Sequence, residues 1–136
     1  MAEKTPGIGD IAWTDLTVRD ANSVREFYRK VVGWKVQHVA MGGYDDYGMT
    51  PPGKKSMAAG VCHARGVNAD IPPVWLVYIV VKNLRRSITA CLRAGGSVIV
   101  PPRPMGKGSM CVIADPAGAI SALYQTRPAT KARRRR

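Results

Sequence analysis

Apolar and polar positions follow the same order twice along the chain, in two stretches offset by 63 residues, the distance from Trp13 to Leu76. Residues 13–20 and 76–83 each read as a β-strand that ends on Asp or Asn. These residue types are typical helix N-caps, because their side-chain oxygens accept free amide protons of the first turn. Apolar residues then recur at helical spacing until Gly33 in one stretch and Gly95-Gly96 in the other. Each stretch therefore begins with a strand and a helix.

Three β-prone runs follow each predicted helix. They cover residues 34–40, 44–50 and 56–63 in the first stretch, and residues 97–100, 109–114 and 119–125 in the second. Pro51-Pro52-Gly53 and Asp115-Pro116-Ala117-Gly118 predict a tight turn before the third run of each stretch. The pattern thus predicts two βαβββ modules. We divide the chain into an N-terminal extension (1–7), a first module (8–63), a linker (64–73), a second module (74–126) and a basic tail (127–136).

Packing requirements predict how the modules combine. A module of about 60 residues buries little more than one face of a four-stranded sheet, so two copies must cover each other, within one chain or by exchange between two. We therefore expect an α+β fold whose mixed β-sheets curl around a shared, mostly apolar cavity, with the helices on the outer faces. On the first strand, alternation directs Ala12, Leu16 and Val18 toward the helix. The cavity side receives Ile11, Trp13, Asp15 and Thr17.

The positive charge is uneven along the sequence. The chain has 21 Lys and Arg against 9 Asp and Glu, a formal net charge of +12. Six of the basic residues follow Thr126, and elsewhere they occur singly or in pairs, as on an ordinary solvated surface. We therefore predict no specific nucleic-acid partner. We expect residues 127–136 to be disordered, and either to make weak contact with anionic lipid or RNA or to serve solubility alone.

Apolar runs and cysteines define the expected compartment. The longest apolar run, residues 74–81, is far shorter than the roughly 18 residues that a membrane span needs, and the first residues lack a secretory signal pattern. Cys62, Cys91 and Cys111 are odd in number and without a C-x-x-C pair. We expect reduced, mostly buried thiols rather than disulfides or a zinc site. Together these features predict a soluble cytoplasmic protein.

Three sequence elements resemble a known family. They are Leu16-Thr-Val-Arg-Asp20, the segment from Glu26-Phe-Tyr to Gly33-Trp34, and Ile113-Ala-Asp-Pro-Ala-Gly-Ala-Ile120. In this order, and within tandem βαβββ modules over about residues 8–126, they resemble the vicinal-oxygen-chelate superfamily. That superfamily contains glyoxalase I, extradiol dioxygenases, fosfomycin-resistance enzymes and bleomycin-binding resistance proteins. The resemblance implies the predicted fold, a homodimer and a small-molecule ligand.

The same resemblance implies four places for metal ligands, on the first and last strands of each module. Here they are occupied by Trp13, Leu76, Met57 (or Ala58) and Ala122. An indole nitrogen only donates, aliphatic groups have no lone pair, and a thioether suits Mg, Mn or Fe poorly. The alternative, a site that joins His38 and His63 with Asp15, Asp45 or Asp46, has no recognised metal spacing. We predict no metal and no cofactor.

Side chains of the same inward parity predict a ligand pocket instead. Trp13 is either a pocket wall or a core residue, and Asp15 either pairs with an Arg or meets a cationic ligand. His63 is either a structural histidine or a ligand contact. Two tyrosines of the nearby glycine-rich segment lie either at the pocket or on a mobile loop. The predicted ligand-binding residues are Trp13, Asp15, Tyr44, Tyr47, Met57, His63, Leu76, Tyr78, Ala122 and Tyr124.

Three functions remain open from the sequence. The first is a metal-independent protein that binds a flat or amphipathic molecule, such as an antibiotic, without catalysis. The second is an enzyme of the same superfamily, a lyase or dioxygenase, with unpredicted metal ligands or with metal-free chemistry by His63 with Asp15 or Tyr124. The third is an RNA- or membrane-associated protein that binds through the Arg-rich tail.

Overall fold

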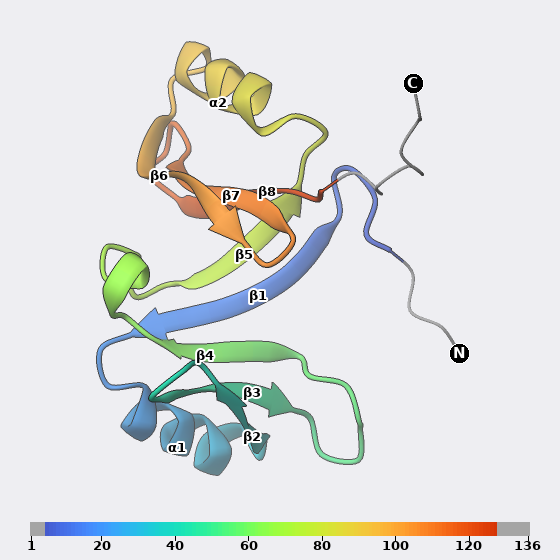
Figure 1. Cartoon of the computed structure of the whole chain (residues 1–136), viewed down its shortest axis with the longest axis vertical. Coiled ribbons are helices and arrows are strands. Elements are labelled where there is room, and N and C mark those ends of the chain that lie inside the picture. The colour runs from blue at the N-terminus through green and yellow to red at the C-terminus, as the bar shows by residue number, and fades with distance from the viewer. Residues whose placement is uncertain (1–4, 128–136) are drawn as a thin grey trace, which may run out of the picture.

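The computed structural model describes residues 5–127, in which eight strands and two α-helices follow the predicted βαβββ order twice (Figure 1). A short 3-10 helix, η1, lies between the modules. The elements are β1 (Ile11–Val18), α1 (Ala21–Val32), β2 (Lys35–Ala40), β3 (Asp45–Thr50), β4 (Ala59–His63), η1 (Gly66–Asn68), β5 (Trp75–Val80), α2 (Leu84–Arg93), β6 (Ser97–Met105), β7 (Gly108–Ala114) and β8 (Ile120–Gln125).

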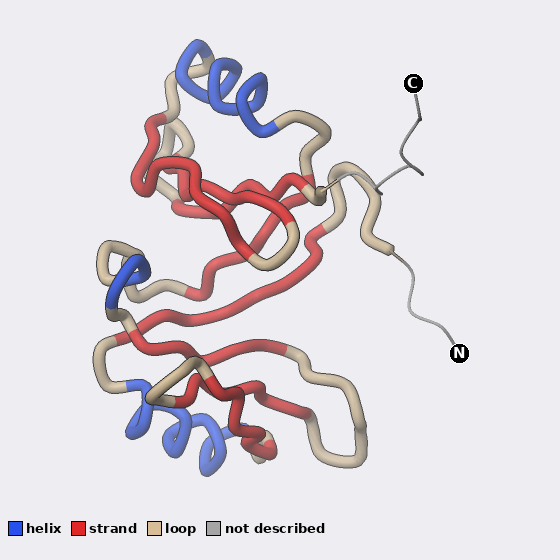
Figure 2. The backbone as a smooth tube through the Cα atoms, viewed as in Figure 1, coloured by secondary structure: helices blue, strands red, loops and turns tan. Residues whose placement is uncertain are grey.

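All eight strands belong to one mixed sheet, in the order β2-β3-β4-β1-β5-β8-β7-β6. Within each module the first and last strands are parallel, since β1 pairs with β4 and β5 pairs with β8. The modules join through the antiparallel pair β1–β5 of the same chain. The sheet is strongly curved, and α1 and α2 lie on its outer side at opposite ends (Figures 1 and 2). This confirms the predicted α+β fold with a curled sheet and outer helices.

Local sequence signals fix both helices. The Asp20 carboxylate accepts a hydrogen bond from the Ser23 amide at 3.1 Å, and the Asn83 side chain accepts one from the Arg86 amide at 3.0 Å. These side chains are the predicted N-caps. Gly33 ends α1 in the left-handed conformation, with φ of 84°, which glycine adopts without a steric penalty.

Three clusters of buried side chains form the core. Under α1 the cluster centres on Ala21, Met49 and Val61, and under α2 it contains Leu84, Cys111 and Leu123. The third and largest cluster covers the inner, concave face of the second module and contains Leu76, Tyr78, Val100, Met110, Val112 and Ala122. Both faces of the second module are therefore packed, as the all-apolar run in residues 74–81 predicts.

Most strands differ from their predicted bounds by one to three residues, and two of the differences have a clear physical reason. β6 continues to Met105, although residues 101–104 contain three prolines that predicted an earlier end. Proline is tolerated there because β6 is an edge strand, and its register shifts twice along β7. β4 begins only at Ala59, because residues 51–58 form a loop. Within residues 5–127, no helix is long and apolar enough to cross a membrane.

Candidate functional site

An apolar pocket of about 280 Å³ opens where the two modules meet. Its walls come from β1, β5, β8 and the turn between β6 and β7. The lining residues are Ala12, Trp13, Tyr78, Met105, Gly106 and Tyr124. Three aromatic side chains and a flexible thioether make a surface that accepts a flat apolar molecule.

A β-bulge explains how Ala12 reaches this pocket. Ile11 pairs with Ile79 and Trp13 pairs with Tyr78, so Ala12 is an extra residue on β1. The predicted alternation fails at this point. Ala12 lines the pocket rather than facing α1, and the Ile11 side chain, expected in the cavity, is 63% exposed.

Asp15 and Tyr78 form a buried pair next to the pocket. The Tyr78 hydroxyl donates to the two carboxylate oxygens of Asp15 at 3.1 and 3.4 Å. Burial raises the pKa of Asp15 to about 6, although the Tyr78 hydroxyl and the Trp13 indole act in the opposite direction as donors. Burial and the adjacent carboxylate also raise the pKa of Tyr78. The pair therefore places a buried carboxyl with a raised pKa next to Tyr78, which lines the pocket.

The polar surroundings of Asp15 belong mostly to the first module. The Asp46 carboxylate is buried, accepts a hydrogen bond from the His63 amide at 2.9 Å and opposes ionisation of Asp15. Arg103 on β6 favours the ionised form, and its guanidinium donates to the Asn68 side chain. Among the described residues Asp15 therefore forms no ion pair with an Arg; Tyr78 provides its hydrogen bonds, and Arg103 acts on it only weakly, through charge.

Strand register identifies the residue at the metal-ligand position that the family resemblance implies on the last strand of the first module. Tyr78 pairs with Ala122, and Asp15, 63 residues before Tyr78, pairs with Gly60. Gly60 is therefore the counterpart of Ala122. The prediction that Met57 or Ala58 occupies this metal-ligand position is wrong. The error arises because residues 57 and 58 belong to the loop before β4.

A close approach explains why the residue at this place is glycine. A Cβ on Gly60 would lie 3.2 Å from the Asp15 Cβ and 3.4 Å from the Trp13 ring. The missing side chain leaves room for the indole against β4. Met57 covers β3 in a similar way, because its sulfur occupies the space that a Cβ on Gly48 would need.

The four positions that the family resemblance implies for metal ligands are therefore occupied by Trp13, Gly60, Leu76 and Ala122. None of these side chains has a lone pair to offer a divalent ion, and catalytic metal sites use about three protein ligands. Among residues 5–127, moreover, no three His, Cys, Asp or Glu side chains come together as metal ligands would. The residues present do not fit the metal that the fold family implies.

The structure places three predicted pocket residues elsewhere. Tyr47 pairs with Val61 on the face that α1 covers, and its hydroxyl donates to Asn22 of α1. The His63 ring lies beside Tyr44 and Tyr47, at centroid distances of 5.6 and 5.9 Å. These three residues thus form a cluster on the outer face. Alternation counted from Met57 predicted His63 inside, but the loop before β4 breaks that count.

Most of the predicted residues share the inner face. Trp13, Tyr78 and Tyr124 line the pocket, while Asp15, Leu76 and Ala122 are buried beside it. The sequence reasoning missed Ala12, Gly60, Met105, Gly106 and Arg103. The glycines of the segment Met105-Gly106-Lys107-Gly108 are a hairpin signal, and following β6 through its prolines would have found this turn.

A family model matches most of the chain. The model of the Glyoxalase/Bleomycin resistance protein/Dioxygenase superfamily matches residues 10–120. This range begins just before β1 and ends at Ile120, the first residue of β8.

Two relatives illustrate the range of named proteins with similar sequences. CFP32 of Mycobacterium tuberculosis, which carries the name of a glyoxylase, is 30% identical in an alignment of 123 positions that covers 83% of this chain and 44% of that protein. DnrV of Streptomyces peucetius, named an anthracycline biosynthesis protein, is 31% identical in an alignment of 129 positions that covers 86% of this chain and 47% of that protein. The chain thus spans less than half the length of these relatives.

A solved structure confirms the architecture. Methylmalonyl-CoA epimerase from Mycobacterium tuberculosis superposes with a TM-score of 0.50 over 85% of this chain and 86% of that one. Since the sequences are only 16% identical, the similarity concerns the fold alone.

Proposed function

We propose that this chain, which belongs to the Glyoxalase/Bleomycin resistance protein/Dioxygenase superfamily, binds a small flat or amphipathic molecule in its apolar pocket without a divalent metal. One observation carries the proposal. The first metal place of the family is occupied by Trp13, whose indole donates no lone pair and forms a wall of the pocket instead. A molecule held there gains affinity from burial and aromatic contact rather than from a metal.

The size of the pocket narrows the ligand class. Pockets for drug-sized ligands range from about 300 to 1,000 Å³, and a volume of about 280 Å³ lies at the lower limit. This favours one or two fused rings over a large antibiotic. The relative named for anthracycline biosynthesis supports a small organic molecule as the ligand.

Titration of the full chain with 2-naphthol tests the proposal. The three tryptophans give three indole N–H signals in a nitrogen-15 NMR spectrum, and we expect 2-naphthol to shift the Trp13 signal while Trp34 and Trp75, packed near α1, stay unchanged. Trp13→Ala should abolish binding measured by calorimetry. Phe27→Ala, which removes an exposed ring from α1, is the matched control and should bind as the wild type does.

Two outcomes would overturn this function. One is a 2-naphthol titration that leaves the Trp13 signal in place or shifts all three tryptophans alike. The other is tightly held, stoichiometric divalent metal in the purified protein, because the proposal assigns binding to a pocket without metal ligands.

A second candidate is a metal-free enzyme that uses Asp15 to move a proton. The pKa of about 6 for Asp15 suits acid–base chemistry near neutral pH, and its partner Tyr78 lines the pocket. The enzymes that share this fold support the candidate. Catalysis by His63 together with Asp15 is not supported, because the His63 ring lies on the outer face of the sheet. Turnover that Asp15→Asn abolishes while 2-naphthol still binds would favour the enzyme over the binding protein.

A further inference from the structure

Three side chains that line the apolar pocket carry a hydrogen-bond donor, and two of these donors are already engaged. The three are Trp13, Tyr78 and Tyr124, and the other lining residues offer no side-chain donor. The Tyr78 hydroxyl donates to the Asp15 carboxylate at 3.1 and 3.4 Å, and the Trp13 indole is a second donor to that carboxylate. Tyr124 is therefore the remaining donor in the pocket wall.

The Tyr124 hydroxyl has no partner within the described part of the chain. Of the five tyrosines, Tyr28, Tyr47 and Tyr78 have hydroxyls bonded to other side chains. The hydroxyls of Tyr44 and Tyr124 make no such bond within residues 5–127. Neither belongs to the fully buried side-chain atoms that lack a partner there, which are both arginine Nε atoms. The Tyr124 hydroxyl thus stays accessible, and it can bond to water or to a ligand.

The hairpin between β6 and β7 fixes where this hydroxyl lies. Tyr124 pairs with Met110 of β7, and its ring extends along the sheet to Gly108 at the start of the same strand. A Cβ on Gly108 would lie 2.8 Å from the Tyr124 hydroxyl oxygen, so the missing side chain gives the phenol room. Met105 and Gly106 of this hairpin line the pocket. The hydroxyl therefore lies at the hairpin side of the pocket.

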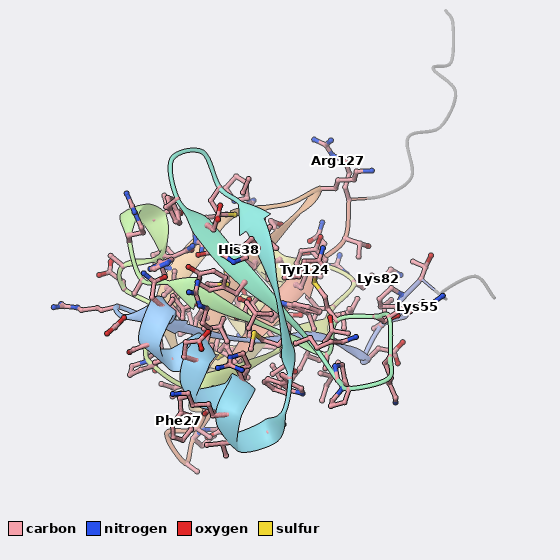
Figure 3. The ribbon with its side chains drawn as sticks, turned by 90° about the horizontal axis from the view of Figure 1, so that it is seen from below. Phe27, His38, Lys55, Lys82, Tyr124 and Arg127 are labelled. Atoms are coloured by element: carbon pink, nitrogen blue, oxygen red, sulfur yellow. The ribbon has the colours of Figure 1, made fainter. Side chains whose placement is uncertain are left out.

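Packing holds the ring of Tyr124 in place before any ligand binds. The side chain is half-buried and packs against the apolar cluster on the inner face of the second module. In Figure 3 it lies within the outline of the folded chain, whereas the Arg127 side chain projects from the periphery. A ring that is already ordered loses little freedom when its hydroxyl bonds to a ligand. The hydrogen bond can then contribute to affinity almost in full.

We propose that Tyr124 determines the ligand class, by donating a hydrogen bond to an oxygen carried on a flat aromatic ring system. This inference rests on the proposed function of the pocket. Apolar walls with a single free polar group accept many flat molecules but orient those that pair with that group. A ligand without such an oxygen would displace water from the hydroxyl and leave it unpaired. The pocket should therefore prefer phenols and related oxygenated aromatics to unsubstituted hydrocarbons of the same size.

A cycle of two proteins and two ligands tests the proposal on the full chain. The proteins are the wild type and Tyr124→Phe, and the ligands are 2-naphthol and naphthalene, which differ only in the hydroxyl group. Each titration follows the Trp13 indole signal in nitrogen-15 NMR spectra. We expect the ratio of the Kd for naphthalene to the Kd for 2-naphthol to be about fivefold larger in the wild type, the effect of one neutral hydrogen bond. The change should come from weaker binding of 2-naphthol, since phenylalanine keeps the ring.

The matched control is Tyr44→Phe, which removes the other unpartnered tyrosine hydroxyl. The Tyr44 ring lies on the outer face beside His63, so this variant should keep the wild-type ratio. An unchanged ratio in Tyr124→Phe would overturn the role of Tyr124 and leave the pocket as the binding site. A fall of the same size in Tyr44→Phe would also overturn it, because the effect would not depend on the pocket. If the wild type bound neither ligand, the proposed function itself would fail.

Discussion

The two modules share one fold but differ on the face that they turn inward. In the second module that face is a closely packed apolar cluster, in which Leu76, Met110 and Val112 are fully buried. In the first module the same face carries the buried polar residues Asp15 and Asp46, together with glycines at positions 48 and 60. Tyr78 connects the two, because it packs in the apolar cluster and donates to Asp15.

This difference shows how two copies of one arrangement can carry two tasks. The second module supplies stability and most of the pocket wall, since burial of its apolar side chains is favourable without any specific geometry. The first module accepts the buried Asp15 carboxyl, whose ionisation in the folded state costs stability. Variants that exchange these properties test whether the division of roles is real.

Asp15→Asn should give the largest effect. Asp15 has a pKa of about 6 when folded against 3.8 when exposed, so the folded state prefers the protonated form. The associated stability is present below pH 3.8 and is lost as the pH rises through 6. The shift corresponds to about 3 kcal/mol. Since asparagine remains neutral, we expect the variant to gain stability over the wild type from pH 4 to pH 7, by up to about 3 kcal/mol in urea unfolding.

The control for this experiment is Asp70→Asn, which changes an exposed carboxylate in the linker. Its difference from the wild type should vary little over the same pH range. If the stability difference between Asp15→Asn and the wild type did not change with pH, ionisation of Asp15 would not destabilise the first module. The two inner faces would then differ in packing alone.

Exchange of the two counterpart residues should give an intermediate effect. Gly60→Ala adds a methyl group 3.2 Å from Asp15 and 3.4 Å from the Trp13 ring, and such overpacking costs about 1–2 kcal/mol. Ala122→Gly at the matching place should cost about 1 kcal/mol, from backbone freedom and lost contact. Unfolding in urea measures both, and the Trp13 indole signal should move only in Gly60→Ala. If that signal stays in place, the glycine is not required for the position of the indole.

The fold was predictable because its signals are local. Asp20, Asn83 and Gly33 mark helix ends through contacts within a few residues, and repetition of these signals at a constant offset reveals the two modules. The end of β6 was not predictable in this way. Its prolines oppose a strand by local rules, and only the position at the edge of the sheet makes them acceptable.

The candidate site was predictable only within uninterrupted strands. Trp13, Tyr78 and Tyr124 were placed correctly because alternation holds between each of them and the nearest helix cap or turn. His63 was placed on the wrong face because the alternation was counted through the loop before β4. Ala12 was missed because a bulge is a property of two paired strands, and one strand alone does not show it.

Asn83→Asp should give the smallest effect, and it makes the second helix start as the first one does. Asp20 brings a negative charge to the start of α1, whereas α2 begins with a neutral cap, no acidic residue in its first turn and Arg85 and Arg86 instead. A carboxylate at position 83 should interact with the helix dipole and raise stability by about 0.5 kcal/mol at low salt. Because this gain is electrostatic, it should disappear in 0.5 M sodium chloride, whereas loss of the cap in Asn83→Ala should lower stability at both salt concentrations.

The reverse exchange, Asp20→Asn, should lower stability at low salt only. Equal behaviour of Asn83→Asp at both salt concentrations would mean that the starts of the two helices differ in geometry rather than in charge.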